Sequence, residues 1–269
     1  MEILVTNDDG IDSPGLWALA EAMSRIGPTM VVAPDKEQSG VGTSVSIVRN
    51  GNLTVEEVTS RVAGVTAYAI GGTPTDCVIV AMRQLSQGKR FDVLVSGINP
   101  GANVGRDVHF SGTVSATLQG HFRNMASVAV SLVLRYRGEE PDYEVAALAA
   151  EHVVRQIAAG HLPVGPILNV NVPNVPIEEI RGVVTTRTAK VGYTRLARVS
   201  STEGASFAME RRPGDESQHP EGTDIWAVNA NMVSITPFTL DPTDHGLVAD
   251  LSEPVRQLES DLLGDRKAE

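Results

Sequence analysis

The chain opens with Met1-Glu-Ile-Leu-Val-Thr-Asn7-Asp8-Asp9-Gly10, a short apolar run that ends in two adjacent aspartates. A Val/Ile/Leu-rich run of this length, bounded by turn residues, is typical of a buried strand. In open α/β sheets ligands bind beyond the carboxyl ends of the strands, and Asp8 and Asp9 stand at such an end. Two ionised carboxylates there repel each other, so a divalent cation between them would relieve that cost. The same residues also suit a plain turn, because Asn, Asp and Gly tolerate tight backbone geometry.

Helical and strand patterns alternate after this opening. Apolar residues recur at helical spacing from Leu16 to Met23 and stop at Gly27-Pro28, and residues 29–33 form a second apolar run. This βαβ opening predicts an α/β fold with a parallel sheet. We expect further strands at residues 66–70, 92–96, 127–134 and 167–172, and helices at residues 74–85, 113–120 and 143–159.

Two segments depart from the alternation. Residues 43–48 and 53–58 are β-like and are joined through Asn50-Gly51, a strong hairpin signal, so we expect a β-hairpin there. Residues 187–229 are polar and irregular, which predicts an extended arm or lid. A strand at 233–237 and a short helix at 255–263 should follow. The expected organisation is one domain over residues 1–269, with an α/β core at 1–186 and the arm, returning strand and helix at 187–269.

Composition restricts the partners of the chain. With 269 residues and 42% hydrophobic composition, it is long enough to bury one full core. Its 33 acidic and 22 basic residues give a net charge of −11, which argues against duplex nucleic acid or an anionic membrane as the main partner. The one cysteine, Cys77, predicts no internal disulfide and a reducing compartment. With no leader pattern and no apolar run of the ~20 residues that a membrane span needs, we expect a cytoplasmic protein.

Oxygen donors, not nucleotide-binding motifs, mark the predicted strand ends. No G-x-x-x-x-G-K-[ST] occurs, and the glycines of residues 97–105 are spaced too widely for G-x-G-x-x-G. Asp8 and Asp9 follow the first strand, Ser39 lies in the loop after the second, and Asn99 lies in the loop after the strand at 92–96. These are hard donors of the kind that Mg²⁺, Mn²⁺ or Ca²⁺ prefers, so we expect them to converge on one ion.

The segment Ser111-Gly112-Thr113 precedes a predicted helix. Exposed N–H groups and the helix dipole attract anions at such a place, and the two hydroxyls add donors, so a phosphate group would fit. The alternative is a plain N-cap at Thr113, which would form with or without a ligand.

Taken in order, these motifs resemble the survival protein SurE family. The matching segments run along nearly the whole chain: Asn7-Asp8-Asp9-Gly10, Ala33-Pro-Asp-Lys-Glu-Gln-Ser39-Gly40, Gly71-Gly-Thr-Pro-Thr-Asp-Cys77, Ser96-Gly-Ile-Asn99-Pro-Gly-Ala-Asn103, Ser111-Gly-Thr-Val114, Leu168-Asn-Val-Asn-Val-Pro173, Thr223-Asp224 and Val233-Ser-Ile-Thr-Pro237. The resemblance implies a Rossmann-like three-layer sandwich with a mainly parallel sheet, and a C-terminal arm exchanged in a homodimer. It also implies a phosphomonoesterase dependent on one divalent metal ion, Mg²⁺ or Mn²⁺, that acts on nucleoside 5′- and 3′-monophosphates and, in some members, on polyphosphate.

Matching motifs also imply roles for single residues. Asp8, Asp9, Ser39 and Asn99 would ligate the metal, as donor chemistry also suggests, and Asp8, Asp9 and Asn99 would be catalytic. Asp9 would partner a metal-polarised water that attacks phosphorus, without a protein nucleophile. The implied contacts to the substrate phosphate are Asn103, Ser111, Gly112 and Thr113. No motif supplies the leaving-group acid: a histidine side chain is a common general acid, so His109 is a candidate, but a passive loop role suits it equally.

Two rival hypotheses and the assembly remain open at this level. A haloacid-dehalogenase-type phosphatase uses a strand-end Asp in a D-x-D-G-T pattern and forms an aspartyl-phosphate, whereas here the aspartates are adjacent and Ile11 follows the glycine. The other rival is a non-catalytic nucleotide- or metal-binding module. Because the arm and C-terminal segment carry too little amphipathic pattern to fold alone, a homodimer is the smallest assembly we expect, with a tetramer left open.

Overall fold

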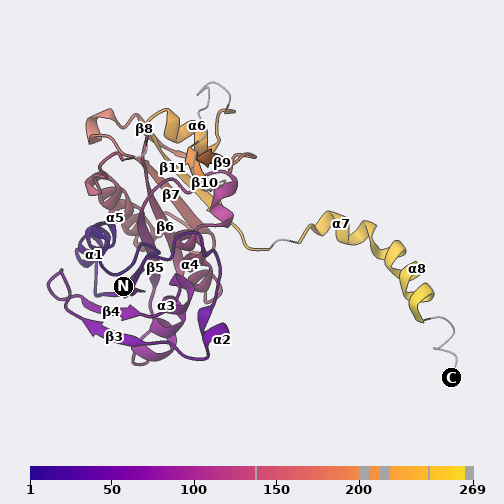
Figure 1. Ribbon diagram of the computed structural model, residues 1–269, viewed down its shortest axis with the longest axis horizontal. Helices are drawn as coiled ribbons and strands as arrows, with labels where there is room; N and C mark the ends of the chain where they lie inside the picture. Colours follow the sequence, from indigo (N-terminus) through magenta and orange to yellow (C-terminus); the bar gives the residue numbers. More distant parts are fainter. Residues whose placement is uncertain (137, 200–205, 212–218, 242, 264–269) are drawn as a thin grey trace. The chain divides into compact units, whose positions relative to one another are not determined.

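The computed structural model of the protein describes residues 1–136, 138–199, 206–211, 219–241 and 243–263. The chain divides into two units, Met1–Phe238 and Thr239–Glu269. The first contains a nine-stranded sheet with covering helices, and the second contains α7 (His245–Asp250) and α8 (Ser252–Leu263) (Figure 1). Within the described ranges, no helix combines the length and the apolar character needed to cross a membrane.

The sheet is mostly parallel, as the alternating pattern predicted. Its strand order is β3-β4-β2-β1-β5-β6-β7-β11-β8, and only the β3–β4 and β7–β11 pairs are antiparallel. The carboxyl ends of β1, β2, β4 and β5 therefore meet at one edge of the sheet, which is where ligands bind in such folds. The strands are β1 (Ile3–Thr6), β2 (Thr29–Pro34), β3 (Val55–Val58), β4 (Thr66–Ile70), β5 (Val93–Pro100), β6 (Ala126–Val133), β7 (Ile167–Pro173), β8 (Gly182–Thr185) and β11 (Met232–Phe238).

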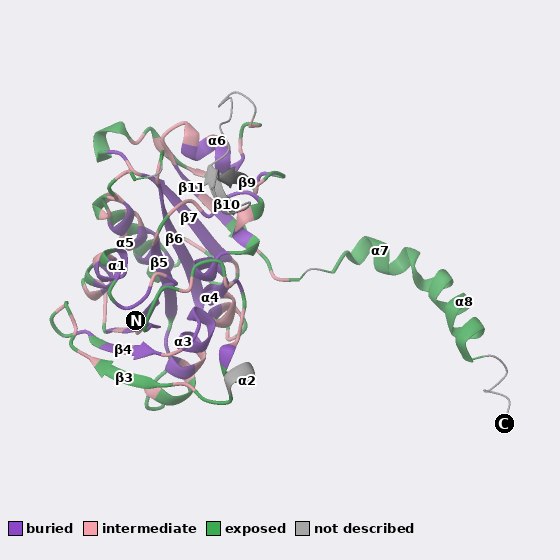
Figure 2. Ribbon diagram, viewed as in Figure 1, coloured by how far each residue is buried: buried purple, intermediate pink, exposed green. Residues whose placement is uncertain are grey.

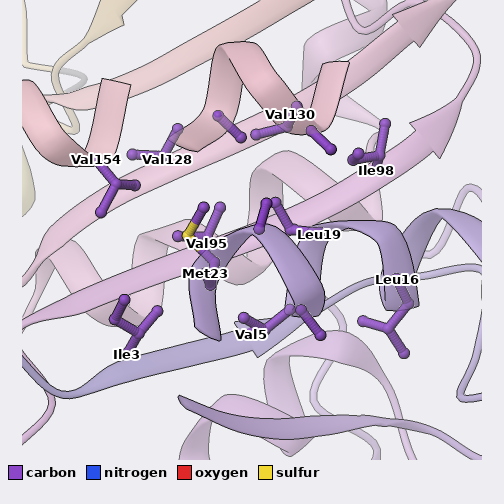
Figure 3. Packing of buried hydrophobic residues seen from close by; sticks show 14 of the residues in the cluster. Ile3, Val5, Leu16, Leu19, Met23, Val95, Ile98, Val128, Val130 and Val154 are labelled. Atoms are coloured by element: carbon purple, nitrogen blue, oxygen red, sulfur yellow. The ribbon is translucent and has the colours of Figure 1, made fainter. Parts of the chain in front are cut away.

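Helices cover both faces of the sheet, which confirms the three-layer sandwich. Ile3 and Val5 of β1 pack with α1 and α5 in one apolar cluster, while Leu4, between them, belongs to a second cluster with α3 and α4. Successive side chains of a strand point to opposite faces, so the two clusters lie on opposite sides. Figure 3 shows the first cluster, with Leu19 of α1 among the strand side chains. The helices are α1 (Pro14–Ser24), α3 (Pro74–Val80), its π-helical continuation η1 (Ala81–Leu85), α4 (Gly112–His121), α5 (Glu144–Ala158) and the 3₁₀ turns η2 (Arg106–His109) and η3 (Ile177–Glu179).

The hairpin expected at Asn50-Gly51 is wrong. Residues 46–50 form a short helix, α2 (Ser46–Asn50), and Gly51 ends it in the left-handed conformation, with its N–H donating to Ile47 O at 2.9 Å. A glycine at positive φ serves a hairpin turn and a helix C-cap equally well, so the local signal was ambiguous. β3 instead pairs antiparallel with β4.

The predicted arm is partly ordered against the core. Within residues 187–229 the structure has the antiparallel pair β9 (Thr194–Val199) and β10 (Ser206–Arg211) and the helix α6 (Asp224–Asn229). The buried side chain of Ile225 on α6 packs in a third apolar cluster with Val104 and Val133. Residues 200–205 and 212–218 of the expected arm lie outside the described residues, and exchange of the arm between subunits stays a prediction.

The second unit is an amphipathic helical segment. Leu251, Val255, Leu258 and Leu262 recur at helical spacing and are all exposed, and Figure 2 shows α7 and α8 as exposed throughout. The helix predicted at residues 255–263 is thus confirmed as part of α8.

Candidate functional site

The turn after β1 both makes the bend and presents the aspartates. Asn7 is buried and closes the turn: its Nδ2 donates to Gly10 O at 2.9 Å, and Gly10 N donates to its Oδ1 at 3.3 Å. Gly10 has φ +97°, a conformation that glycine adopts without strain. The turn and the metal hypotheses are therefore compatible, because Asn7 and Gly10 shape the loop while Asp8 and Asp9 are left to act.

The carboxylate of Asp8 lies at the N-terminus of α4. Thr113 Oγ1 donates to Asp8 Oδ1 at 2.5 Å, and a Cβ on Gly112 would lie only 2.8 Å from Asp8 Oδ2. Burial raises the pKa of Asp8, and the Thr113 hydroxyl and the backbone N–H groups of Gly112 and Thr113 oppose that rise. Asp8 therefore occupies part of the helix N-terminus at which the sequence predicted a bound phosphate.

Asp9 is a carboxylate in need of a positive partner. Its Oδ2 is buried and makes no hydrogen bond within the described structure. Burial, followed by the negative charges of Asp8 and Glu37, raises the pKa of Asp9 to about 8. Burial and the charge of Asp9 also raise the pKa of Tyr143, at the start of α5, to about 12. A buried, unpaired oxygen of this kind is rare unless something binds it, and a cation fits its charge.

The loop after β2 lies directly against this turn. Gln38 N donates to Asp8 O at 2.7 Å, and Ser39 Oγ donates to Glu37 Oε1 at 2.8 Å. Ser39 is exposed and keeps its oxygen on the loop surface. Sequence reasoning missed Glu37, whose charge acts on Asp9. Its position two residues before Ser39 was the available signal.

Asn99 follows the neighbouring strand in the same direction. β1 pairs with β5 through Thr6 and Ser96, and the register of β5 against β6 shifts between Ser96 and Asn99. β5 continues to Pro100, so the expected loop begins later than predicted. Asn99 Nδ2 donates to Gly101 O at 2.7 Å, which leaves the carbonyl oxygen Oδ1 as the atom suited to a cation.

Asn103 is held in a buried amide network. Its Nδ2 donates to Ser131 Oγ at 2.8 Å, its backbone N–H donates to Asn171 Oδ1 at 2.9 Å, and its carbonyl accepts from the amides of Asn169 and Asn171. The side-chain donor of Asn103 is thus engaged inside the protein. Its visible role is to anchor the loop that leads to α4.

Ser111, not Thr113, caps α4. Ser111 Oγ accepts from Val114 N at 3.1 Å, and Thr113 lies inside the helix with its hydroxyl donated to Asp8. The plain N-cap at Thr113, the alternative that the sequence left open, does not form, because the Thr113 hydroxyl donates to the buried carboxylate of Asp8. Ser111 can still donate its own hydroxyl hydrogen. His109 is exposed at the end of η2. Its carbonyl oxygen would lie 3.7 Å from a Cβ placed on Gly42, so η2 borders the loop after Ser39.

The donor set suits a hard divalent ion bound by mixed oxygen ligands. Among the residues that the structure describes, no three His, Cys, Asp or Glu side chains are grouped to hold a metal. Two carboxylates with an amide and a hydroxyl oxygen are the remaining arrangement, and Mg²⁺ is typically bound in proteins through only one or two carboxylates. The unpartnered Oδ2 of Asp9 is the observation that supports this fit.

Comparison with known proteins identifies the family of the chain. The model of the family "Survival protein SurE" matches residues 3–195. A Geobacter metallireducens protein named 5′-nucleotidase SurE is 39% identical over 93% of this chain and 96% of its own length, and one of the same name from Dehalococcoides mccartyi strain CBDB1 is 38% identical over 88% of each. The crystal structure of the Sure protein from Aquifex aeolicus superposes with a TM-score of 0.79 at 34% identity, covering 96% of this chain and all of that one. The chain belongs to the survival protein SurE family.

Proposed function

We propose that the protein is a 5′-nucleotidase: a divalent-metal-dependent phosphomonoesterase that releases phosphate from nucleoside 5′-monophosphates. The observation that carries the proposal is the pair Asp8 and Asp9 at the end of β1, with a buried oxygen of Asp9 left without a partner. The name that the relatives bear, 5′-nucleotidase, supports the same activity. The non-catalytic alternative is not favoured. By family resemblance we extend the proposal to 3′-monophosphates and leave polyphosphate to the substrate panel below.

Asp8, Asp9, Ser39 and Asn99 would hold one Mg²⁺ or Mn²⁺ ion. The ion, when bound, supplies positive charge that activates water and offsets charge on the phosphate. Asp8 is already oriented by Thr113 and by the start of α4, so its carboxylate needs little rearrangement to ligate. Asn99 would contribute Oδ1, since its Nδ2 is donated to Gly101.

The chain's own groups account for binding and proton transfer. The Ser111 hydroxyl would donate to a phosphate oxygen at the start of α4, beside the carboxylate of Asp8, which the backbone N–H groups of Gly112 and Thr113 already stabilise. Asp9 would accept the proton of the attacking water through the carboxylate oxygen that does not ligate the ion, because a bound cation keeps this carboxylate ionised and able to act as a base. The water oxygen then bonds to phosphorus as the bond between phosphorus and the ester oxygen breaks, and the ester oxygen takes a proton from solvent water and leaves as the hydroxyl of the nucleoside. Thr113 would act chiefly through Asp8.

Phosphate release from a panel of nucleoside monophosphates tests the proposal. Wild type and Asp8→Ala would be assayed with Mg²⁺, with Mn²⁺ and with EDTA, and polyphosphate would be included. We expect metal-dependent turnover that Asp8→Ala abolishes. A folded wild type that binds the ion but releases no phosphate from any substrate would refute the enzymatic proposal.

We further propose a homodimer in a reducing, cytoplasmic setting. The exposed apolar side chains of α7 and α8 favour coverage by a second chain, and Cys77 is buried as a free thiol. Light scattering at micromolar concentration tests the assembly: a monodisperse monomer would contradict it, and a tetramer would show that dimers pair further.

A further inference from the structure

A polar pocket opens at the same edge of the sheet, beside the candidate metal ligands. Its volume is about 480 Å³, and it is lined by Asp35, Lys36, Gln38, Thr54, Gly71 and Gly72 among others. We call it the β2–β4 pocket, because its walls are the loops that follow β2 and β4. Its size lies in the range of small-molecule sites.

Strand order places this pocket next to the aspartates. Along the edge the order is β3, β4, β2, β1, β5, and neighbouring strands lie about 4.8 Å apart. The loop after β2 is therefore about 5 Å from the end of β1 along this direction, and the β4 and β3 ends lie at about 10 and 15 Å. Gln38 joins the two regions: it lines the pocket while its backbone N–H donates to Asp8 O. Gln38 therefore belongs both to the pocket lining and to the loop that contacts the turn of Asp8 and Asp9.

Two of the hydroxyls that line the pocket are already engaged within the protein. Ser46 and Thr73, which also line it, are committed elsewhere, because both hydroxyls donate to the carboxylate of Asp76. Asp35 is exposed, and its N–H donates to Ile70 O of β4 at 2.8 Å. Among the residues that the structure describes, no donor is bonded to the Asp35 carboxylate, so it is available as an acceptor.

The β4 and β3 side forms the opposite wall. Gly71 N donates to Thr54 O at 3.0 Å, and a Cβ on Gly71 would lie 2.2 Å from Thr54 Oγ1. A side chain at position 71 would require the Thr54 side chain to move, so these two residues pack closely in this wall.

We propose that the β2–β4 pocket binds the nucleoside of the substrate, with the Asp35 carboxylate accepting hydrogen bonds from the sugar hydroxyls. A nucleotide whose phosphate lies at Asp8 and Asp9 meets the loop after β2 first and the wall of Thr54 and Gly71 second. The sugar, which adjoins the phosphate, therefore lies by Asp35, and the base lies against the wall. This inference rests on the proposed function and assigns a binding site to the nucleoside, which the phosphate site does not contact.

The test compares substrates that differ only in what the pocket should contact. Wild type, Asp35→Ala and the control Glu57→Ala would be assayed on adenosine 5′-monophosphate, its 2′-deoxy analogue and phenyl phosphate. Glu57 is an exposed carboxylate on β3 outside the pocket lining. Because a hydrogen bond to a charged group is a strong one, Asp35→Ala should lower kcat/KM for adenosine monophosphate about tenfold, chiefly through KM. It should reduce the preference over the deoxy analogue and leave phenyl phosphate and the Glu57→Ala variant unchanged.

Equilibrium binding separates failure of this inference from failure of the proposed function. Adenosine monophosphate and its deoxy analogue would be titrated by calorimetry into wild type and Asp35→Ala. If wild type binds nucleotide in an Asp35-dependent way but hydrolyses no substrate, the nucleoside-binding role of the pocket is supported and the proposed enzymatic activity is refuted. If turnover occurs but Asp35→Ala changes neither affinity nor sugar preference, or lowers phenyl phosphate turnover in parallel, the pocket is not the nucleoside site.

Discussion

Metal-free protein should lose stability as the pH rises from about 4 to about 8, and Asp9 should contribute to that loss. Burial and the charges of Asp8 and Glu37 raise the pKa of Asp9 from 3.8 to about 8. Between these values the folded protein holds a proton that the unfolded chain has released, so the free energy of unfolding falls as the pH rises. The contribution is fully present below the unfolded pKa and is lost by the time the pH passes the folded pKa.

The size of the effect follows from the shift. Each unit of pKa difference corresponds to about 1.4 kcal/mol, so between pH 5 and pH 8 the loss from Asp9 is about 4 kcal/mol. This is an upper value, because Asp9 retains some exposure to water, which screens its charge. Asp9→Asn cannot ionise and should remove this part of the pH dependence, so the variant should be more stable than wild type at pH 8 without metal.

Urea unfolding in EDTA at several pH values, followed by circular dichroism, measures this directly. Glu57→Gln, which neutralises an exposed carboxylate on β3, is the matched control and should follow wild type. Saturating Mn²⁺ should flatten the wild-type curve, because a bound cation favours the ionised carboxylate, and should do little for Asp9→Asn. Parallel curves for wild type and Asp9→Asn in EDTA would refute the reasoning, since Asp9 would then ionise in the folded state at no cost.

Three further substitutions test the surroundings of the site. Thr113→Val removes the hydroxyl that donates to Asp8. It should weaken Mn²⁺ binding, measured by calorimetry, about tenfold or more, and Thr113→Ser should bind Mn²⁺ as wild type does. Equal affinities in all three proteins would exclude an orienting role for Thr113. Gly112→Ala places a Cβ 2.7 Å from Asp8 Cβ and should lower both Mn²⁺ affinity and phosphate release. The control Gly165→Ala, where nothing lies within 4 Å of the new Cβ, should change neither. Full activity in Gly112→Ala would show that Asp8 can move freely. Asp224→Asn disturbs a buried carboxylate that accepts from three backbone N–H groups and should lower the free energy of unfolding by about 1–3 kcal/mol in urea, and an unchanged midpoint would argue against it as an anchor.

Local pattern was sufficient for the strands and for the loops that carry the donors. The apolar runs that became β1, β2, β4 and β5 each end in turn or polar residues, and parallel strands bring those ends to one edge whatever the details of packing. The sequence therefore predicted that Asp8, Asp9, Ser39 and Asn99 lie at the same edge of the sheet. Thr73-Pro74 was likewise a sufficient helix start, and the structure shows a capping box there with Asp76.

Local pattern failed where a distant residue supplied the partner. The β-like run at residues 43–48 does not form a strand, because Ser46 N and Oγ both donate to Asp76 Oδ2, 30 residues away. Those bonds start a helix instead, and Gly51 ends it. No window of sequence around Asn50 contains that information.

The sequence alone determined the α/β alternation and the sheet edge to which the loops of Asp8, Asp9, Ser39 and Asn99 belong, because these depend on hydrophobic periodicity and on residue types at strand ends. Only the tertiary structure decided how the donors are used. It placed the carboxylate of Asp8 at the start of α4, engaged the Thr113 hydroxyl there, left Asp9 Oδ2 unpaired and brought the charge of Glu37 to bear on it. Hydrogen bonding and burial join residues about a hundred positions apart, and these contacts exist only once the strands and helices have packed.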